Sequence, residues 1–241
     1  MEAASRGIAG ADFDVVHYGL ASTPAMFDIL CPVDGAIMII ASHLPNNRNG
    51  FKFFTNVGGL GKADIKDILE RAANVYNDFT PESLKDAEKK ASLSISKVDY
   101  MSVYASDLVT VIRKASVNIE KPLEGFHIIV DAGNGAGGFF AGKVSEPLGA
   151  VTYGSQFLEP DSLFPNHIPN PEDKAAMKAI RQAVLDNKAD LGIIFDTDVD
   201  RSAVVDSTGR GKHHQFKRGY KNVIDEAIRL VRLSIQKLMI L

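Results

Sequence analysis

Three aspartates at alternate positions follow an apolar segment late in the chain. Asp196, Asp198 and Asp200 come directly after residues 191–195, which have the composition of a buried strand. Carboxylates this close together repel one another unless a cation or bulk water screens them. Arg201 follows at once and offers a fork-shaped donor suited to a phosphate held near the same ion. The pattern predicts a divalent-metal site, with a solvated acidic turn as the alternative.

A serine with acid–base neighbours marks a second loop, earlier in the chain. Ser42 stands where the apolar segment 35–41 ends, next to His43 and ten residues before Lys52. A serine in such a place can act as a nucleophile or carry a phosphoryl group, with His43 or Lys52 moving protons. Three carboxylates and one phosphoserine oxygen also form a suitable shell for Mg²⁺. Together, the two loops predict a centre for phosphoryl transfer.

Strands and helices must bring these loops together. In the first half, β-prone runs alternate with helical patterns, and Asn49-Gly50 supplies the tight turn between two of the strands. The segment 35–41 is apolar on both faces, so we expect it inside a sheet. The expected strands are residues 14–18, 35–41 and 51–55, and the expected helices are residues 62–76, a second that begins at Thr80-Pro81, and residues 98–112.

The second half repeats this alternation after a proline-containing stretch. Residues 118–125 include Lys121-Pro122 and mark the expected domain boundary. Further on, Asn170 and Pro171 form a favourable helix start, with a capping amide and a proline at the first helical position. The expected elements are a strand at 126–130, a glycine-rich turn at 133–138, a helix at 139–148, a strand at 150–153, a helix from 170 to about 187, and strands at 191–195 and 202–205.

The alternation of strands and helices with short connections predicts an α/β fold. We expect two consecutive α/β domains with mixed, mainly parallel sheets and helices on both faces, followed by a short remnant of a third domain. These parts are expected to span residues 1–118, 119–209 and 210–241.

Other suggestive features have structural explanations that we favour. Gly133, Gly135 and Gly138 fit a dinucleotide-binding fingerprint, but no acid ends the next strand, so a tight turn with close helix–strand packing is preferred. His167 lies in a proline-framed loop, where an ordinary turn is preferred over a ligand contact. The two remaining candidates are read as a packed strand residue and as part of a solvated basic loop: His127 and His213-His214.

Composition narrows the function class. The 241 residues carry a net charge of −3 and a 45% apolar content, which suits folded domains and gives no sign of a nucleic-acid or membrane surface. Cys31 is the single cysteine, so no internal disulfide can form. No apolar run approaches the ~20 residues of a membrane-spanning helix. We expect a cytoplasmic protein that binds neither nucleic acid nor membranes.

Two segments of the chain resemble the signature loops of a known family. They read Ala-Ser-His-Leu-Pro at 41–45, followed by Asn-Gly-Phe-Lys at 49–52, and Asp-Thr-Asp-Val-Asp-Arg at 196–201. Both are similar to loops of the α-D-phosphohexomutases, the phosphoglucomutase and phosphomannomutase family, and the flanking sequence is most similar to its plant and bacterial phosphomannomutase-like branch. The resemblance covers residues 5 to about 210 and, more weakly, 211–230.

The resemblance implies an isomerase of carbohydrate metabolism that moves a phosphoryl group between the 1- and 6-positions of a hexose phosphate. Ser42 would carry the phosphoryl group, and a hexose bisphosphate would return it. The resemblance further implies Mg²⁺ held by the three aspartates and the Ser42 phosphate, acid–base roles for Lys52 and His43, and a phosphate contact at Arg201. It also aligns Gly219 and Lys221 with a phosphosugar-binding loop.

The sequence also departs from the family pattern. Ile40 and Leu44 replace a threonine and an asparagine beside Ser42. The chain resembles a family member that starts partway through the first of four domains and lacks most of the third and all of the fourth. A plastid location is conceivable for a full-length relative.

Two other functions remain open. The chain can be a catalytically impaired, metal-binding fragment of such a mutase. A haloacid-dehalogenase-like phosphatase with Asp196 as nucleophile is disfavoured, because residues 202–205 have the pattern of a strand where that fold has a helix-bound loop.

Overall fold

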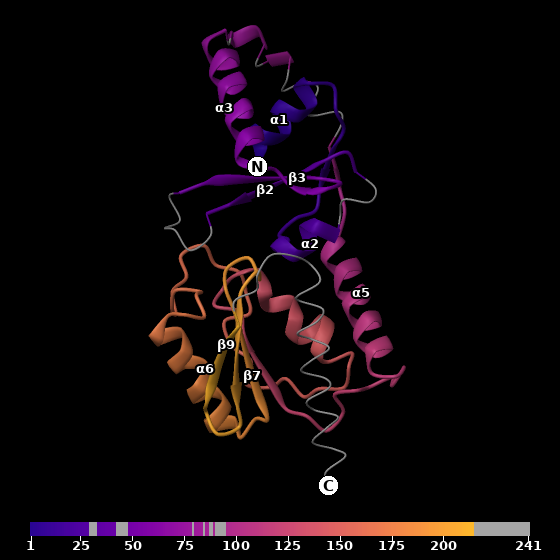
Figure 1. Ribbon diagram of the computed structural model, residues 1–241, viewed down its shortest axis with the longest axis vertical. Helices are drawn as coiled ribbons and strands as arrows, with labels where there is room; N and C mark the ends of the chain where they lie inside the picture. Colours follow the sequence, from indigo (N-terminus) through magenta and orange to yellow (C-terminus); the bar gives the residue numbers. More distant parts are fainter. Residues whose placement is uncertain are drawn as a thin grey trace.

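A computed structural model of the protein describes residues 1–28, 33–41, 48–78, 80–83, 85–86, 89 and 95–214. Two groups of strands lie one beyond the other along the molecule, and the short helix α2 (Thr23–Asp28) lies where they meet (Figure 1). The four residues at the start of α2, Thr23 to Met26, are buried there. The molecule is therefore an α/β protein with two layered parts, as the sequence predicted.

The first part holds two small sheets. β1 (Val15–His17) pairs in parallel with β5 (Ile95–Lys97), while β2 (Ala36–Ile40), β3 (Gly50–Thr55) and β4 (Gly58–Gly59) form an antiparallel sheet in that order. Further helices of this part include α1 (Glu2–Gly10) and α3 (Lys62–Asn77). The antiparallel pairing of β2 and β3 brings both ends of the Ser42 loop to one edge of this sheet, and Gly50, expected in a tight turn, is the first residue of β3 and pairs with Ile40.

The second part is one sheet of four strands with helices on both faces. Its strand order is β6 (Ile128–Asp131), β7 (Leu191–Phe195), β8 (Ser202–Asp206) and β9 (Gly211–His214), with a parallel first pair and antiparallel pairs after it. The sheets are thus mixed, although most strand pairs in the described residues are antiparallel. The helices are α5 (Tyr100–Ala115), a 3₁₀ turn (Ala136–Gly138), a π-helix (Phe140–Ser145) and α6 (Lys174–Asn187).

Alternate residues of the central strands enter two different cores. Ile193 and Phe195 of β7 face a core that includes α5, the π-helix and residues of the first part such as Met26 and Phe54. Ile194 faces the other side, where Ile129 and the apolar face of α6 pack. The period of two along a strand therefore fixes which helix covers which face, and the larger core joins the two parts of the molecule.

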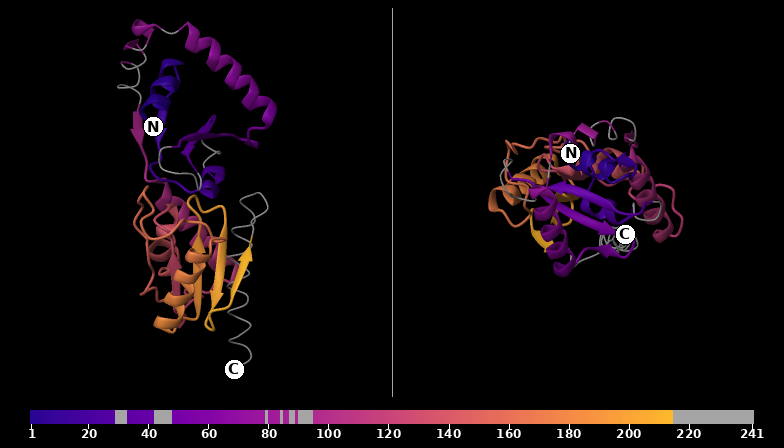
Figure 2. Two further views of the ribbon diagram at one scale, coloured as in Figure 1. Left: turned by 90° about the vertical axis from the view of Figure 1, so that its left-hand side faces the viewer. Right: turned by 90° about the horizontal axis from the view of Figure 1, so that it is seen from above.

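Two elements of the first part are less buried than the sequence predicted. β2 was expected inside a sheet, yet none of its residues is buried, because it is an edge strand of the described sheet. α3 forms as predicted, but its apolar face of Ile65, Ile68, Leu69, Ala72 and Val75 contributes no buried residue. Figure 2 shows α3 running across the outer end of the first part, far from the second part.

Two local predictions for the second part need correction. α6 begins later than expected, because Asp173 rather than Asn170 caps it, accepting hydrogen bonds from the backbone N–H groups of Ala175 and Ala176. The predicted strand at 150–153 is reduced to a single bridge between Val151 and His127. None of the helices in the described residues combines the length and apolar character needed to cross a bilayer.

Candidate metal centre

The three aspartates lie in the tight connection between β7 and β8. The backbone N–H of Asp196 donates to the carbonyl of Arg201 at 3.1 Å, which closes the loop, and Val199 has a positive φ of 66° that lets the chain reverse. One carboxylate oxygen from each aspartate lies within 4.8 Å of the others. Asp196 and Asp198 are buried, whereas the side chain of Asp200 is 41% exposed. The β-hairpin thus gathers the acids at one end of the sheet.

The charge on this cluster is only partly balanced. Burial, and then the carboxylates of Asp198 and Asp200, raise the pKa of Asp196 to about 8. Arg201 opposes this shift through a 2.9 Å ion pair from Nε to Asp196 Oδ2 and a 3.0 Å bond from its backbone N–H to Oδ1. Burial alone would lower the pKa of the Arg201 guanidinium, but the carboxylates of Asp196, Asp200 and Asp198 together raise it. A further cation would therefore be accommodated favourably here.

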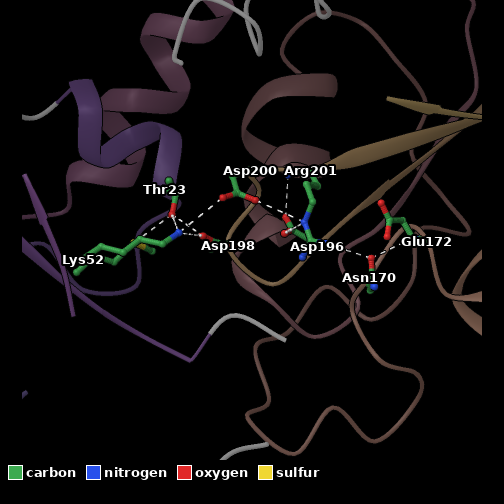
Figure 3. Close-up of polar contacts among 9 residues, drawn as sticks. Thr23, Lys52, Asn170, Glu172, Asp196, Asp198, Asp200 and Arg201 are labelled. Atoms are coloured by element: carbon green, nitrogen blue, oxygen red, sulfur yellow. Dashed lines mark hydrogen bonds and ion pairs between the residues drawn. The ribbon is translucent and has the colours of Figure 1, made fainter. Parts of the chain in front are cut away.

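Lys52 and Thr23 reach the acidic loop from the first part of the molecule. Lys52 Nζ, on β3, lies 2.7 Å from Asp198 Oδ2 and 3.6 Å from Asp200 Oδ2. The hydroxyl of Thr23, at the start of α2, donates to the same Asp198 oxygen at 2.5 Å. Figure 3 shows the two side chains meeting Asp198 from one side while Arg201 meets Asp196 from the other. The acidic loop is thus a contact point between the two parts.

Asn170 holds the outer end of Arg201. Its Oδ1 accepts a 3.4 Å hydrogen bond from Arg201 Nη1 and a 3.1 Å bond from the backbone N–H of Glu172 (Figure 3). The amide that was expected to cap α6 therefore caps only a turn and orients the arginine. Because Arg201 also lies 3.7 Å from Asp200, it is fixed by three partners on one side of the cluster.

The glycine-rich turn supports the acidic loop through its backbone. A Cβ on Gly135 would lie 2.7 Å from the carbonyl oxygen of Thr197, and one on Gly137 would lie 2.9 Å from the Phe195 ring. The backbone N–H of Ala136 donates to that same Thr197 carbonyl at 2.9 Å. The close packing that was preferred over dinucleotide binding is what the structure shows for these glycines.

A buried ion pair ties the proline-framed loop to the sheet. His167 Nε2 lies 3.1 Å from both carboxylate oxygens of Asp131, at the end of β6, and His167 Nδ1 lies 3.0 Å from the Ile168 carbonyl. Burial lowers the pKa of His167, but the bonds to Asp131 and Ile168 outweigh it, so the pKa is raised overall. With an acceptor at each ring nitrogen, the imidazole is suited to carry both protons. Both side chains are almost fully buried, at 2% and 0% exposure.

The donor set fits a hard divalent cation. Carboxylate oxygens are the ligands that Mg²⁺ and Ca²⁺ prefer, and Mg²⁺ is typically held by one or two carboxylates together with phosphate oxygens and water. Burial and the neighbouring carboxylates raise the pKa of Asp196 even though Arg201 pairs with it. Asp196, Asp198 and Asp200 are the residues that would hold the ion.

The structure brings together some of the predicted site residues. Lys52, Arg201 and the three aspartates form one cluster. Four others lie outside the described residues: Ser42, His43, Gly219 and Lys221, and with them most of the expected third-domain remnant. The assigned roles of all these residues remain predictions.

Sequence reasoning missed Thr23 and Asn170. Asn170 was read only as part of a helix start, and that reading rests on local capping chemistry, which says nothing about partners far along the chain. Thr23 was assigned no functional role from the sequence. Thr23 and Asp198 are separated by 175 positions, so only a three-dimensional arrangement could reveal their contact.

Comparison with known proteins identifies the family. The family model described as phosphoglucomutase/phosphomannomutase, alpha/beta/alpha domain I, matches residues 1–78, and that of domain II matches residues 102–209. A phosphoglucomutase from Neisseria gonorrhoeae is 32% identical over 212 residues, which cover 87% of this chain and 42% of that protein. A phosphomannomutase from Salmonella montevideo is 30% identical over 231 residues, covering 90% and 46%.

A solved structure shares the fold. The phosphoglucomutase/phosphomannomutase family protein from Burkholderia thailandensis aligns with a TM-score of 0.58 at 24% identity, over 85% of this chain and 43% of that one. The α/β arrangement, the two matched domains and the aligned relatives show that this chain belongs to the phosphoglucomutase/phosphomannomutase family, an isomerase family. The chain spans less than half the length of these curated relatives.

Proposed function

We propose that this chain carries the phosphoryl-transfer centre of a phosphohexose mutase, acting on a hexose phosphate and a hexose bisphosphate with Mg²⁺. The observation that carries the proposal is the contact of Lys52 with Asp198 and Asp200. Lys52 follows the Ser42 loop on β3, and the aspartates form the candidate metal loop. The contact supports a shared site for the two signature loops.

The proposed chemistry begins with a phosphoserine at Ser42. A hydroxyl oxygen of the hexose phosphate forms a bond to phosphorus while the bond from phosphorus to Ser42 Oγ breaks, and His43 or Lys52 takes up the hydroxyl proton. Reversal at the other hydroxyl of the resulting bisphosphate returns a phosphoryl group to Ser42. A bound Mg²⁺ would supply stabilisation of charge on the transferring group.

The described residues can serve three roles in this scheme. Lys52 is proposed as an acid–base residue, and its Nζ donates a hydrogen bond to Asp198 Oδ2 at 2.7 Å. Arg201, held by Asp196 and Asn170, presents a guanidinium suited to phosphate oxygens. Gly219 and Lys221 are proposed to contact the phosphosugar on grounds of family resemblance.

The second candidate is a fragment that binds metal without turnover. It requires only the clustered carboxylates of Asp196, Asp198 and Asp200. The phosphatase alternative receives no such support, because β8 follows the acids directly and pairs antiparallel with β7.

The test combines phosphate mapping with turnover. After incubation with glucose 1,6-bisphosphate and Mg²⁺, peptide mass spectrometry should find a phosphoryl group on Ser42 and none in the Ser42→Ala variant. Conversion of glucose 1-phosphate or mannose 1-phosphate to the 6-phosphate should follow. Mg²⁺ binding and Ser42 labelling without conversion would support the fragment, whereas label on Asp196 would contradict the mutase proposal.

A further inference from the structure

Thr23 makes a double contact with the metal loop that nothing in the proposed chemistry uses. Its backbone N–H donates to the Asp198 carbonyl at 2.8 Å, and its hydroxyl donates to Asp198 Oδ2 at 2.5 Å. Main chain and side chain of one aspartate are therefore held by main chain and side chain of one threonine. Thr23 is buried, with 7% of its surface exposed, so water does not compete for these bonds.

The two oxygens of the Asp198 carboxylate differ in their contacts. Oδ2 receives both the Thr23 hydroxyl and Lys52 Nζ, the latter at 2.7 Å. Oδ1 has no hydrogen-bond partner among the residues that the structure describes. A carboxylate held through one oxygen is fixed in rotation, so the other oxygen presents its lone pairs in a defined direction.

We propose that Thr23 is a positioning residue: it locks the carboxylate of Asp198 so that Oδ1 is directed at the divalent cation. The inference rests on the proposed metal site. Thr23 touches neither the ion nor the substrate in this scheme, and it acts through Asp198. α2 is well placed for this task, since Thr23 to Met26 are buried between the two parts of the molecule and cannot easily shift.

Lys52 does not make Thr23 redundant. The lysine side chain is 37% exposed and flexible, and its Nζ also reaches Asp200 and the Thr23 hydroxyl, at 3.6 and 3.2 Å. A mobile point charge cannot set the plane of a carboxylate, whereas a buried hydroxyl fixed at the start of a helix can. Thr23 therefore orients the Asp198 carboxylate, and Lys52 contributes positive charge beside it.

The test compares two variants that differ by one oxygen atom. Thr23→Ser and Thr23→Ala both remove the methyl group, but only serine keeps the hydroxyl. Titration of the whole chain with Mn²⁺, followed by the electron paramagnetic resonance signal of free Mn²⁺, should give a Kd for Thr23→Ser close to that of the unchanged protein. Thr23→Ala should bind at least about tenfold more weakly, as is typical when a second-layer partner of a metal ligand is lost.

Controls separate this inference from the proposed function. Thr110→Val removes a hydroxyl that donates only to the Ser106 carbonyl within α5, and it should leave the Kd unchanged. If the unchanged protein binds no Mn²⁺, or if Asp198→Asn binds as well as the unchanged protein, the metal site itself is wrong. If Asp198→Asn loses binding while Thr23→Ala and Thr23→Ser bind equally, the metal site stands and the role of Thr23 is overturned. Far-ultraviolet circular dichroism of each variant shows that the comparison is made between folded proteins.

Discussion

At the scale of single residues, the acidic loop concentrates charge that its surroundings only partly neutralise. Asp196 and Asp198 are buried beside Asp200, and the two nearby cations, Lys52 and Arg201, each serve more than one acid. Burial and mutual repulsion make the negative charges of such a cluster unfavourable, and a bound cation would stabilise them. The individual ligands should therefore have large and specific effects on metal affinity.

Replacing Asp198 by alanine should abolish measurable Mg²⁺ binding. The variant removes a ligand oxygen and also leaves Lys52 and Thr23 without their shared acceptor. Isothermal titration calorimetry with Mg²⁺ is the measurement. Asp107→Asn, which removes an exposed charge on α5, is the matched control, and an unchanged Asp198→Ala affinity would count heavily against the site.

The His167–Asp131 pair should make stability depend on pH. The pKa of His167 is raised on folding, so the stabilisation is complete below the unfolded value of about 6.5 and is lost as pH rises through the higher folded value. His167→Gln should cost about 3 kcal/mol at pH 6, because it leaves a buried carboxylate without its charged partner.

Urea unfolding at pH 6 and pH 9 measures this effect. The unchanged protein should lose stability between the two pH values, and both His167→Gln and Asp131→Asn should reduce that loss. Equal pH dependence in all three proteins would show that the pair is not an imidazolium–carboxylate pair.

At the scale of elements, the glycine-rich turn and the acidic loop behave as one packed unit. The turn at 133–138 contacts the backbone of Thr197, which lies between the first two aspartates. Packing of backbone against backbone leaves no flexible side chain to absorb an added atom. The turn and Thr23 therefore fix the position of the acidic loop.

Gly135→Ala should damage both stability and metal binding. Its Cβ would lie 2.7 Å from Thr197 O and 2.9 Å from Thr197 Cα, so the acidic loop has to move, at a cost of about 1–3 kcal/mol. Gly142→Ala is the control, because a Cβ there meets nothing within 4 Å. Urea unfolding and Mg²⁺ titration of both variants test the idea, which fails if the two behave alike.

At the scale of the whole molecule, the two parts share a core. Met26 and Phe54 from the first part belong to the same apolar cluster as Ile193 and Phe195 from the second. Phe54→Ala, at a 4% exposed site, should cost about 3 to 5 kcal/mol.

Because the core is shared, Phe54→Ala should have a second effect. Its effect should spread, so that amide hydrogen exchange becomes faster in β7 as well as in β3. An effect confined to residues 1–78 would show that the parts unfold separately.

The sequence predicted elements and chemistry better than it predicted contacts. The strands beside both signature loops and the α/β class follow from apolar patterns and turn residues, and they are confirmed. The late start of α6 was missed because Asn170 and Asp173 are both good capping residues, and only the fold decides between them. Thr23 was missed because its partner is distant in sequence, and the domain boundary at residue 118 remains a prediction.

The bonds from Thr23 and Lys52 to Asp198 join segments that belong to different family domains. In the proposed metal site, ion binding and the packing of Thr23 and Lys52 against Asp198 are therefore linked equilibria, and each changes the other by the same factor.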